Sequence, residues 1–115
     1  MNPTKKDEGL DDLKARPVAL AGLVAYQSGA VVSREIVSRS AGTITAFAFD
    51  AGEQLSEHTA PYDAMVVGLD GEADIMIGGK ANRVRPGEMI IMPAGVSHAL
   101  KAVSRFKMLL VMIKK

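Results

Sequence analysis

Short strand-like segments separated by turn residues fill most of the chain after residue 30, and this pattern limits the fold more than any other feature. Residues 31–39 are rich in β-branched side chains, and residues 43–49 alternate Thr and Phe with Ile and Ala, as a strand with two distinct faces would. About eight or nine such segments with regular turn signals are typical of a β-sandwich or a β-barrel. We therefore predict an all-β fold.

Two turn signals in the middle of the chain predict hairpins. Asp70-Gly71 is typical of a type I′ turn, because both central positions of that turn need positive φ, and it should close a hairpin between residues 64–69 and 72–77. Gly78-Gly79 should close a second hairpin with residues 80–85. The latter segment is polar enough to be an exposed or edge strand.

The two ends of the chain differ in character. We expect residues 1–16 to form a polar tail with a helical turn around residues 10–14, and residues 17–115 to form a single barrel domain. Residues 17–24 are short and apolar, so a buried strand and a helical turn both stay open. Residues 105–113 are apolar on both faces from Met108 onward, so a second subunit is expected to cover one face, as in a homodimer.

Charge and composition argue against several classes of partner. Lys and Arg number 14 against 13 Asp and Glu, the basic residues are scattered, and the aromatic residues are two Tyr and three Phe. Nucleic-acid binding normally uses a basic face with interleaved aromatic side chains and is not expected. No apolar run reaches the roughly 18 residues that span a bilayer, and no apolar signal core follows Met1, so we expect no membrane partner and a cytoplasmic location.

The two histidines of the chain, His58 and His98, each follow a turn-rich entry into an apolar run. The chain has no cysteine, which removes disulfides, thiolate catalysis and Cys-based zinc sites. Neutral imidazoles bind Fe, Mn, Ni, Cu and Zn, but a metal held here would also need carboxylate or water ligands. The alternative is that both histidines are buried and satisfied by backbone or hydroxyl partners.

The segment that ends at His98 resembles the second signature motif of the cupins, which are small jelly-roll barrels, or double-stranded β-helices. That motif requires Gly, Pro, Gly and His at fixed spacing, and Gly87, Pro93, Gly95 and His98 meet it in full. Its usual final Asn is replaced by Ala102. The resemblance covers roughly residues 30–113 and implies a small single-domain cupin of the conserved-barrel (cupin 2) type, among which proteins of unassigned function occur.

The first cupin motif is kept only in outline. Gly52 and His58 fit it, but Ala60 stands where cupins have a second His. The position of the usual Glu falls on Ala64 or on Met65, depending on the count. Two of the four metal ligands usual in the family are therefore absent by residue type, and a metal would rely on water or on a chelating ligand.

The resemblance implies that His58 and His98 point into the barrel as pocket residues and candidate metal ligands. Asp63 would add a third ligand if the chain after Pro61 is bulged, and would otherwise cap a turn with its carboxylate. Tyr62 either closes the mouth of the pocket or is simple packing. Gln54 lies four residues before His58, on the same face by strand parity, where it either hydrogen-bonds a ligand or is exposed.

Two functions stay open at this point, because the cupin fold supports many activities. One is a small-molecule pocket protein that acts as an enzyme on a small oxygenated substrate with one divalent transition metal, Fe, Mn, Ni, Cu or Zn. The other is a non-catalytic binding or sensor module with a reduced or absent metal site. A stable oligomer with a vestigial pocket is a third reading. No organic cofactor is implied.

Overall fold

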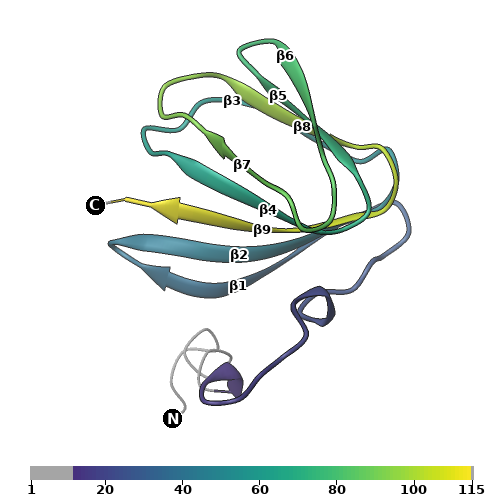
Figure 1. Ribbon diagram of the computed structural model, residues 1–115, viewed down its shortest axis with the longest axis vertical. Helices are drawn as coiled ribbons and strands as arrows, with labels where there is room; N and C mark the ends of the chain where they lie inside the picture. The colour runs from purple at the N-terminus through teal and green to yellow at the C-terminus, as the bar shows by residue number, and fades with distance from the viewer. Residues whose placement is uncertain (1–11, 115) are drawn as a thin grey trace.

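Nine β-strands in two facing antiparallel sheets make up the fold in the computed structural model, which describes residues 12–114 (Figure 1). This confirms the predicted all-β jelly-roll barrel. The strands are β1 (Val31–Arg39), β2 (Gly42–Phe49), β3 (Gln54–His58), β4 (Ala64–Asp70), β5 (Ala73–Ile77), β6 (Lys80–Val84), β7 (Met89–Met92), β8 (His98–Ala102) and β9 (Phe106–Ile113).

The chain crosses repeatedly between the two sheets. The five-stranded sheet has the order β1-β2-β9-β4-β7, and the four-stranded sheet has the order β3-β8-β5-β6. From β3 onward nearly every connection therefore leads from one sheet to the other, as in a jelly roll. Because of these crossings, strands far apart in the sequence, such as β3 and β8, become neighbours.

One of the two predicted hairpins is wrong. The strands β4 and β5, on either side of Asp70-Gly71, lie in different sheets and do not pair. Gly71 does have positive φ, +68°, but a Cβ atom there would lie 1.6 Å from the carbonyl oxygen of Arg105. The glycine thus permits a close backbone approach at a crossing between sheets.

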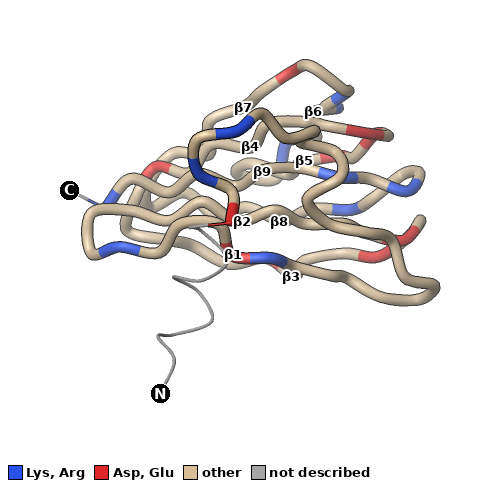
Figure 2. The backbone as a smooth tube through the Cα atoms, turned by 90° about the horizontal axis from the view of Figure 1, so that it is seen from below, with Lys and Arg blue, Asp and Glu red and all other residues tan. Residues whose placement is uncertain are grey.

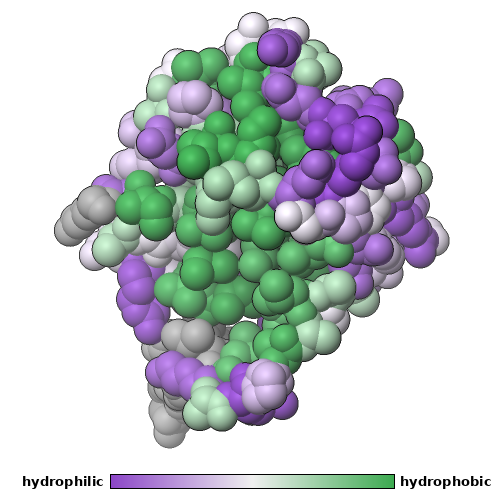
Figure 3. Space-filling view, viewed as in Figure 1, coloured by the Kyte–Doolittle hydropathy of each residue, from purple (hydrophilic) through white to green (hydrophobic). Residues whose placement is uncertain are grey.

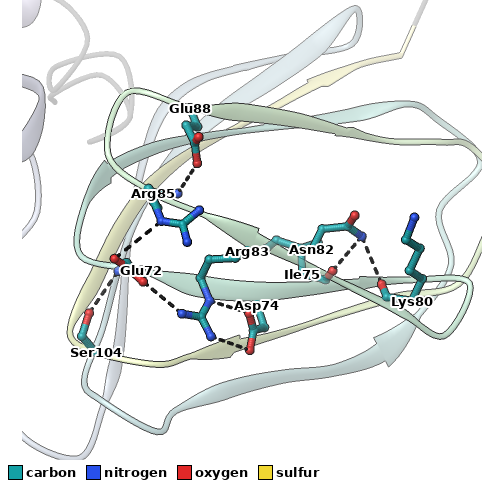
Figure 4. A network of polar contacts seen from close by, with 9 residues as sticks. All are labelled: Glu72, Asp74, Ile75, Lys80, Asn82, Arg83, Arg85, Glu88 and Ser104. Atoms are coloured by element: carbon teal, nitrogen blue, oxygen red, sulfur yellow. Dashed lines mark hydrogen bonds and ion pairs between the residues drawn. The ribbon is translucent and has the colours of Figure 1, made fainter.

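The second predicted hairpin is confirmed. β5 pairs with β6, with Ile77 opposite Lys80, and both Gly78 and Gly79 have positive φ. β6 is an edge strand, as its polar sequence predicts. Arg83 on β6 binds the carboxylates of Asp74 and Glu72 at 2.7 and 3.0 Å on the side of the hairpin away from the core (Figure 4). Because they are exposed, these ion pairs contribute little to the stability of the fold.

Two hydrophobic clusters hold the barrel together. The main core lies between the sheets, and its largest fully buried side chains are Phe49, Val66, Ile75, Phe106 and Met108. A second cluster lies on the outer face of the five-stranded sheet, where four buried residues meet: Leu23, Val24, Ala46 and Ala48. The part of β2 around Ala46 and Ala48 is therefore covered on both faces, on one of them by the segment that precedes β1.

That preceding segment contains a short 3-10 helix, η1 (Leu20–Gly22), which decides the open choice for residues 17–24 in favour of a helical turn. Of the helical turn expected around residues 10–14, only the part from residue 12 is described, and residues 12–13 are helical. The rest of the expected turn lies outside the described residues. No helix within residues 12–114 is long and apolar enough to cross a membrane.

Polar contacts fasten this segment to the sheet. The Tyr26 hydroxyl donates to a carboxylate oxygen of Asp70, and the Lys107 ammonium donates to the carbonyl of Ala21 at 2.6 Å. Burial and the bond to Asp70 raise the pKa of the Tyr26 phenol above its ordinary value. Arg105 and Lys107 also lie 5.2 and 4.8 Å from the centre of the Tyr26 ring, within the range of cation–π attraction.

The rest of the outer face of the five-stranded sheet has no such cover in the described part of the chain. We call it the outer apolar face; it consists of Ile44, Met65, Met89, Ile91, Val111 and Ile113, of which Met89, Ile91 and Ile113 are 55%, 50% and 60% exposed. Hydrophobic residues gather over β2, β4 and β9 in Figure 3. Basic and acidic residues are interspersed over the described backbone rather than segregated (Figure 2).

Candidate functional site

The two histidines meet at one end of the β3–β8 pair. His58 is the last residue of β3, His98 is the first residue of β8, and they lie opposite each other in the register. Their Nε2 atoms are 3.1 Å apart, and the rings meet edge to face with centroids separated by 4.4 Å. Two side chains 40 positions apart in sequence therefore form one polar group.

A backbone carbonyl oxygen lies beside Nδ1 of each ring. The Nδ1 atom of His58 lies 2.8 Å from the carbonyl oxygen of Ser56, and that of His98 lies 3.3 Å from the carbonyl oxygen of Val96. A carbonyl oxygen only accepts hydrogen bonds, so we assign the proton of each neutral ring to Nδ1. Both Nε2 lone pairs then face each other at 3.1 Å, so the pair by itself forms a hydrogen bond between the rings only if one proton moves to Nε2, whereas a cation or a ligand donor between the rings suits both protons as assigned.

The two rings differ in exposure. His98 is buried, with 6% of its surface exposed, whereas His58 is exposed. Burial, and secondly the neighbouring His58, lower the pKa of the His98 imidazole below its ordinary value. His98 is therefore neutral at neutral pH and keeps its Nε2 lone pair available.

A bulge in β3 decides which residues share the face of His58. Leu55 is opposite Leu100 and His58 is opposite His98, so three steps along β3 match two steps along β8. A single extra residue inverts the alternation of side chains. Leu55 therefore lies on the same face as His58, and the expectation that Gln54 shares this face is wrong: Gln54 is exposed and lies opposite Lys101.

An apolar cavity of about 120 Å³ adjoins the histidine pair inside the barrel. Residues from both sheets form its walls: Leu55, His58, Ala60, Ala64, Val66, Met92, His98, Ala99, Leu100, Met108, Leu110 and Met112. The imidazoles of His58 and His98 are the only polar side chains among these lining residues. Ala60, at a position where cupins have a His ligand, and Ala64, one of the two residues at the position of the usual Glu, both line the cavity and leave room in it.

Of the two roles that the sequence left open for Asp63, metal ligand and turn cap, the structure shows the turn cap. Its carboxylate accepts a hydrogen bond from the backbone N–H of Ala94 at 2.8 Å and so holds the turn before His98. It is absent from the cavity lining. No group of three or more His, Asp or Glu side chains that could hold a metal occurs within residues 12–114, so the expectation of a third ligand from Asp63 is not met.

Tyr62 also lies apart from the cavity lining. It is half-buried, and the Lys114 ammonium lies 6.0 Å from the centre of its ring. The wall residues that sequence reasoning missed, such as Val66 and Leu110, stand on β4 and β9 at core-facing positions. Their alternation could have identified them as inward-facing, but not as cavity lining rather than filled core.

The fold and the site together define a small jelly-roll barrel whose apolar cavity is headed by two histidines. Residues 46–114 match the family described as the cupin domain. The chain belongs to the cupin family.

Solved structures agree with this assignment. A conserved protein of unknown function from Streptococcus pyogenes is 42% identical, with 88% of this chain and 89% of that chain covered and a TM-score of 0.84. A cupin superfamily protein from Desulfitobacterium hafniense is 29% identical over 89% and 94% of the two chains, also with a TM-score of 0.84. A cupin 2 conserved barrel domain protein from Leptotrichia buccalis is 40% identical over 82% of this chain and 46% of that one, with a TM-score of 0.79. No curated protein matches the sequence.

Proposed function

We propose that this cupin binds a small molecule in the barrel cavity and that His58 and His98 form the polar head of the site, where together they hold one divalent transition metal. The observation that carries the proposal is the convergence of the two Nε2 atoms, 3.1 Å apart, beside an otherwise apolar cavity. Each ring is oriented by a backbone carbonyl, as metal-binding imidazoles commonly are.

The two imidazoles supply two of the ligands that a transition metal needs. At the usual metal–nitrogen distance of about 2.1 Å, nitrogens separated by 3.1 Å can both reach a single ion. The remaining positions would fall to water or to oxygen atoms of the bound compound, because no third protein ligand stands near the pair among the described residues. Fe, Mn, Ni, Cu and Zn all accept imidazole.

Such an ion would act as a Lewis acid on a small oxygenated substrate. The residues of the chain would do the rest. The two imidazoles would place the reacting oxygen at the head of the cavity, and the apolar walls would exclude water from it, which strengthens electrostatic interactions there. This is the enzyme form of the proposal.

A non-catalytic binding or sensor module is the second candidate. It is favoured by the absence of any carboxylate from the cavity lining, so that no protein group offsets the charge of a divalent ion or offers a second acid–base group. Measured turnover separates the two candidates. A compound that raises the melting temperature without being converted identifies the module.

The metal proposal is tested by counting bound ions in the purified protein after exposure to Mn, Fe, Ni, Cu or Zn and removal of excess. We expect a single ion for each wild-type chain and none in His58→Ala or His98→Ala. Gln54→Ala, an exposed change on the same strand, is the matched control and should keep the ion. Unchanged stoichiometry in both histidine variants would exclude the pair as the site.

We also propose that two copies of the chain associate through the outer apolar face. The exposed Ile91 and Ile113 support this, since a contiguous apolar patch of this kind marks an interaction surface. A two-fold axis through the sheet would pair each face with its equivalent in the second copy.

A further inference from the structure

We infer, on the basis of the pocket proposed above, that the ligand is an uncharged, single-ring aromatic alcohol of the phenol type. The ring occupies the apolar cavity, and the hydroxyl lies at the histidine pair. Size, wall chemistry and the properties of the head group lead to this class independently.

The size of the cavity sets the first limit. Its volume is about 120 Å³. An engineered protein cavity of about 150 Å³ lined by apolar side chains binds benzene. The buried part of the ligand is therefore about as large as one six-membered ring, and a fused two-ring compound or a disaccharide exceeds the space.

The walls set the second limit. Apart from the two histidines, every lining residue is Ala, Val, Leu or Met, and no Lys, Arg, Asp, Glu, Ser, Thr, Asn or Gln lines the cavity. A buried hydroxyl or charge without a partner is costly. A sugar would leave several hydroxyls unpaired, and in the metal-free protein a carboxylate or an ammonium group within the cavity would have no opposite charge.

The walls also favour an aromatic ring over an aliphatic one. Met92, Met108 and Met112 all line the cavity. Thioether sulfur makes favourable contacts with aromatic rings, of about 0.3–1.5 kcal/mol each, and flexible methionines fit a flat ring closely.

The head of the cavity fixes the polar group. With both Nδ1 protons committed to carbonyl oxygens, each Nε2 is an acceptor, so the ligand must supply a donor. A hydroxyl donates its proton to Nε2 directly, and its oxygen is also a suitable ligand for an ion held by the pair. A ring with a single hydroxyl therefore matches the site with or without metal.

Phenol, benzoate and glucose test the inference on the full chain. Thermal denaturation and calorimetric titration of the protein stripped of metal by a chelator should show that phenol raises the melting temperature with concentration, whereas benzoate and glucose at the same concentrations leave it unchanged. Equal stabilisation by benzoate or glucose, or no effect of phenol, would overturn the inference.

A variant that fills the cavity locates the phenol. Ala64 is 2% exposed and lines the cavity, so Ala64→Leu should occupy the space and weaken phenol binding at least about tenfold. Met65→Leu, the next residue along β4 but on the outer apolar face, is the matched control and should bind phenol as wild type does. Equal affinity in Ala64→Leu would place the phenol elsewhere.

Methionine methyl signals in nuclear magnetic resonance give a test that needs no variant in the cavity. Phenol should shift the signals of Met92, Met108 and Met112 and leave those of Met65 and Met89 in place. Shifts confined to Met65 and Met89 would contradict the inference.

Failure of the ligand class and failure of the histidine head are distinguishable. If phenol does not bind but metal uptake still depends on His58 and His98, the ligand class is wrong and the head stands. If phenol binds with equal affinity in wild type and His58→Ala, and metal uptake is also unchanged, the cavity assignment stands and the role of the histidines is wrong.

Discussion

Backbone carbonyls beside each histidine determine how the pair can act. The carbonyls of Ser56 and Val96 hold both Nδ1 protons, so His58 and His98 present two acceptors to the same point. A pair oriented by other side chains could be disrupted by a single substitution. Here the orientation comes from the backbone of β3 and of the turn before β8, and the imidazoles themselves are the groups that substitution can remove.

Asp63 gives a test at this scale, because its carboxylate is close in sequence to His58 but is bonded to a turn. Asp63→Ala removes the hydrogen bond to the N–H of Ala94 and should lower the free energy of unfolding by about 1 kcal/mol, measured by urea denaturation. Metal stoichiometry should not change. Loss of the metal with unchanged stability would instead make Asp63 a ligand.

The meeting of the two histidines could be predicted from the sequence, because Gly87, Pro93, Gly95 and His98 match a motif whose fold is known. The side-chain neighbours of His58 could not. Strand parity put Gln54 on its face, and the bulge between Leu55 and His58 reversed that parity. Nothing in the residue types of this segment marks the extra residue.

Asp50, which follows β2, connects the ends of three strands through its carboxylate. Its carboxylate accepts hydrogen bonds from the N–H of Gly29, before β1, at 2.7 Å and from Arg105, before β9, at 2.9 Å. The bond from Gly29, followed by that from Arg105, lowers the pKa of the Asp50 carboxyl below its ordinary value. The folded chain therefore holds this carboxylate ionised to lower pH than the unfolded chain does.

This shift predicts how stability depends on pH. An unfolded Asp titrates at about pH 3.9, and the folded Asp50 titrates lower, so the unfolded state binds more protons in this range. Its stabilising contribution is present above about pH 4 and is lost as the pH falls through the folded pKa. Asp50→Asn should be less stable than wild type at pH 7, and the difference should shrink toward pH 2 in urea denaturation.

Arg105→Gln should also lower stability at pH 7, but by less than Asp50→Asn, because the hydrogen bond from Gly29, the larger cause of the lowered Asp50 pKa, remains. A difference between wild type and Asp50→Asn that is constant with pH would contradict the assignment.

Turn chemistry alone predicted one hairpin correctly and one wrongly. Gly78-Gly79 joins strands that pair directly, so the local signal was sufficient. Asp70-Gly71 also has a residue of positive φ, but the chain after it crosses to the other sheet. Which sheet receives the next strand depends on contacts distant in sequence, such as the approach of Gly71 to Arg105.

In the whole molecule, the outer face of the five-stranded sheet is only partly covered by the rest of the described chain. Residues 17–30 cover the part around Ala46 and Ala48, and the outer apolar face remains open beside it. The apolar pattern of residues 105–113 predicted that both faces of this strand are covered. The sequence could not show how much of that cover comes from the same chain and how much from a second subunit. The division into a tail of residues 1–16 and one barrel domain stays a prediction.

The proposed dimer is tested by placing a charge on this face. Ile113→Glu and Ile91→Glu should shift the protein from dimer to monomer in sedimentation equilibrium, because a buried unpaired carboxylate is costly at an interface. Val103→Glu is the matched control, since Val103 is 47% exposed but lies after β8, outside the outer apolar face. A wild-type protein that is monomeric at all concentrations would exclude the dimer.

The central claim is that the two imidazoles hold one metal ion at the head of the cavity. Anomalous diffraction from crystals of metal-loaded protein, recorded at the absorption edge of the loaded metal, tests it most directly. The account predicts one strong anomalous peak within bonding distance of Nε2 of both His58 and His98, and no such peak in His58→Ala. Loaded crystals with no peak between the rings, or with the peak elsewhere on the chain, would contradict it.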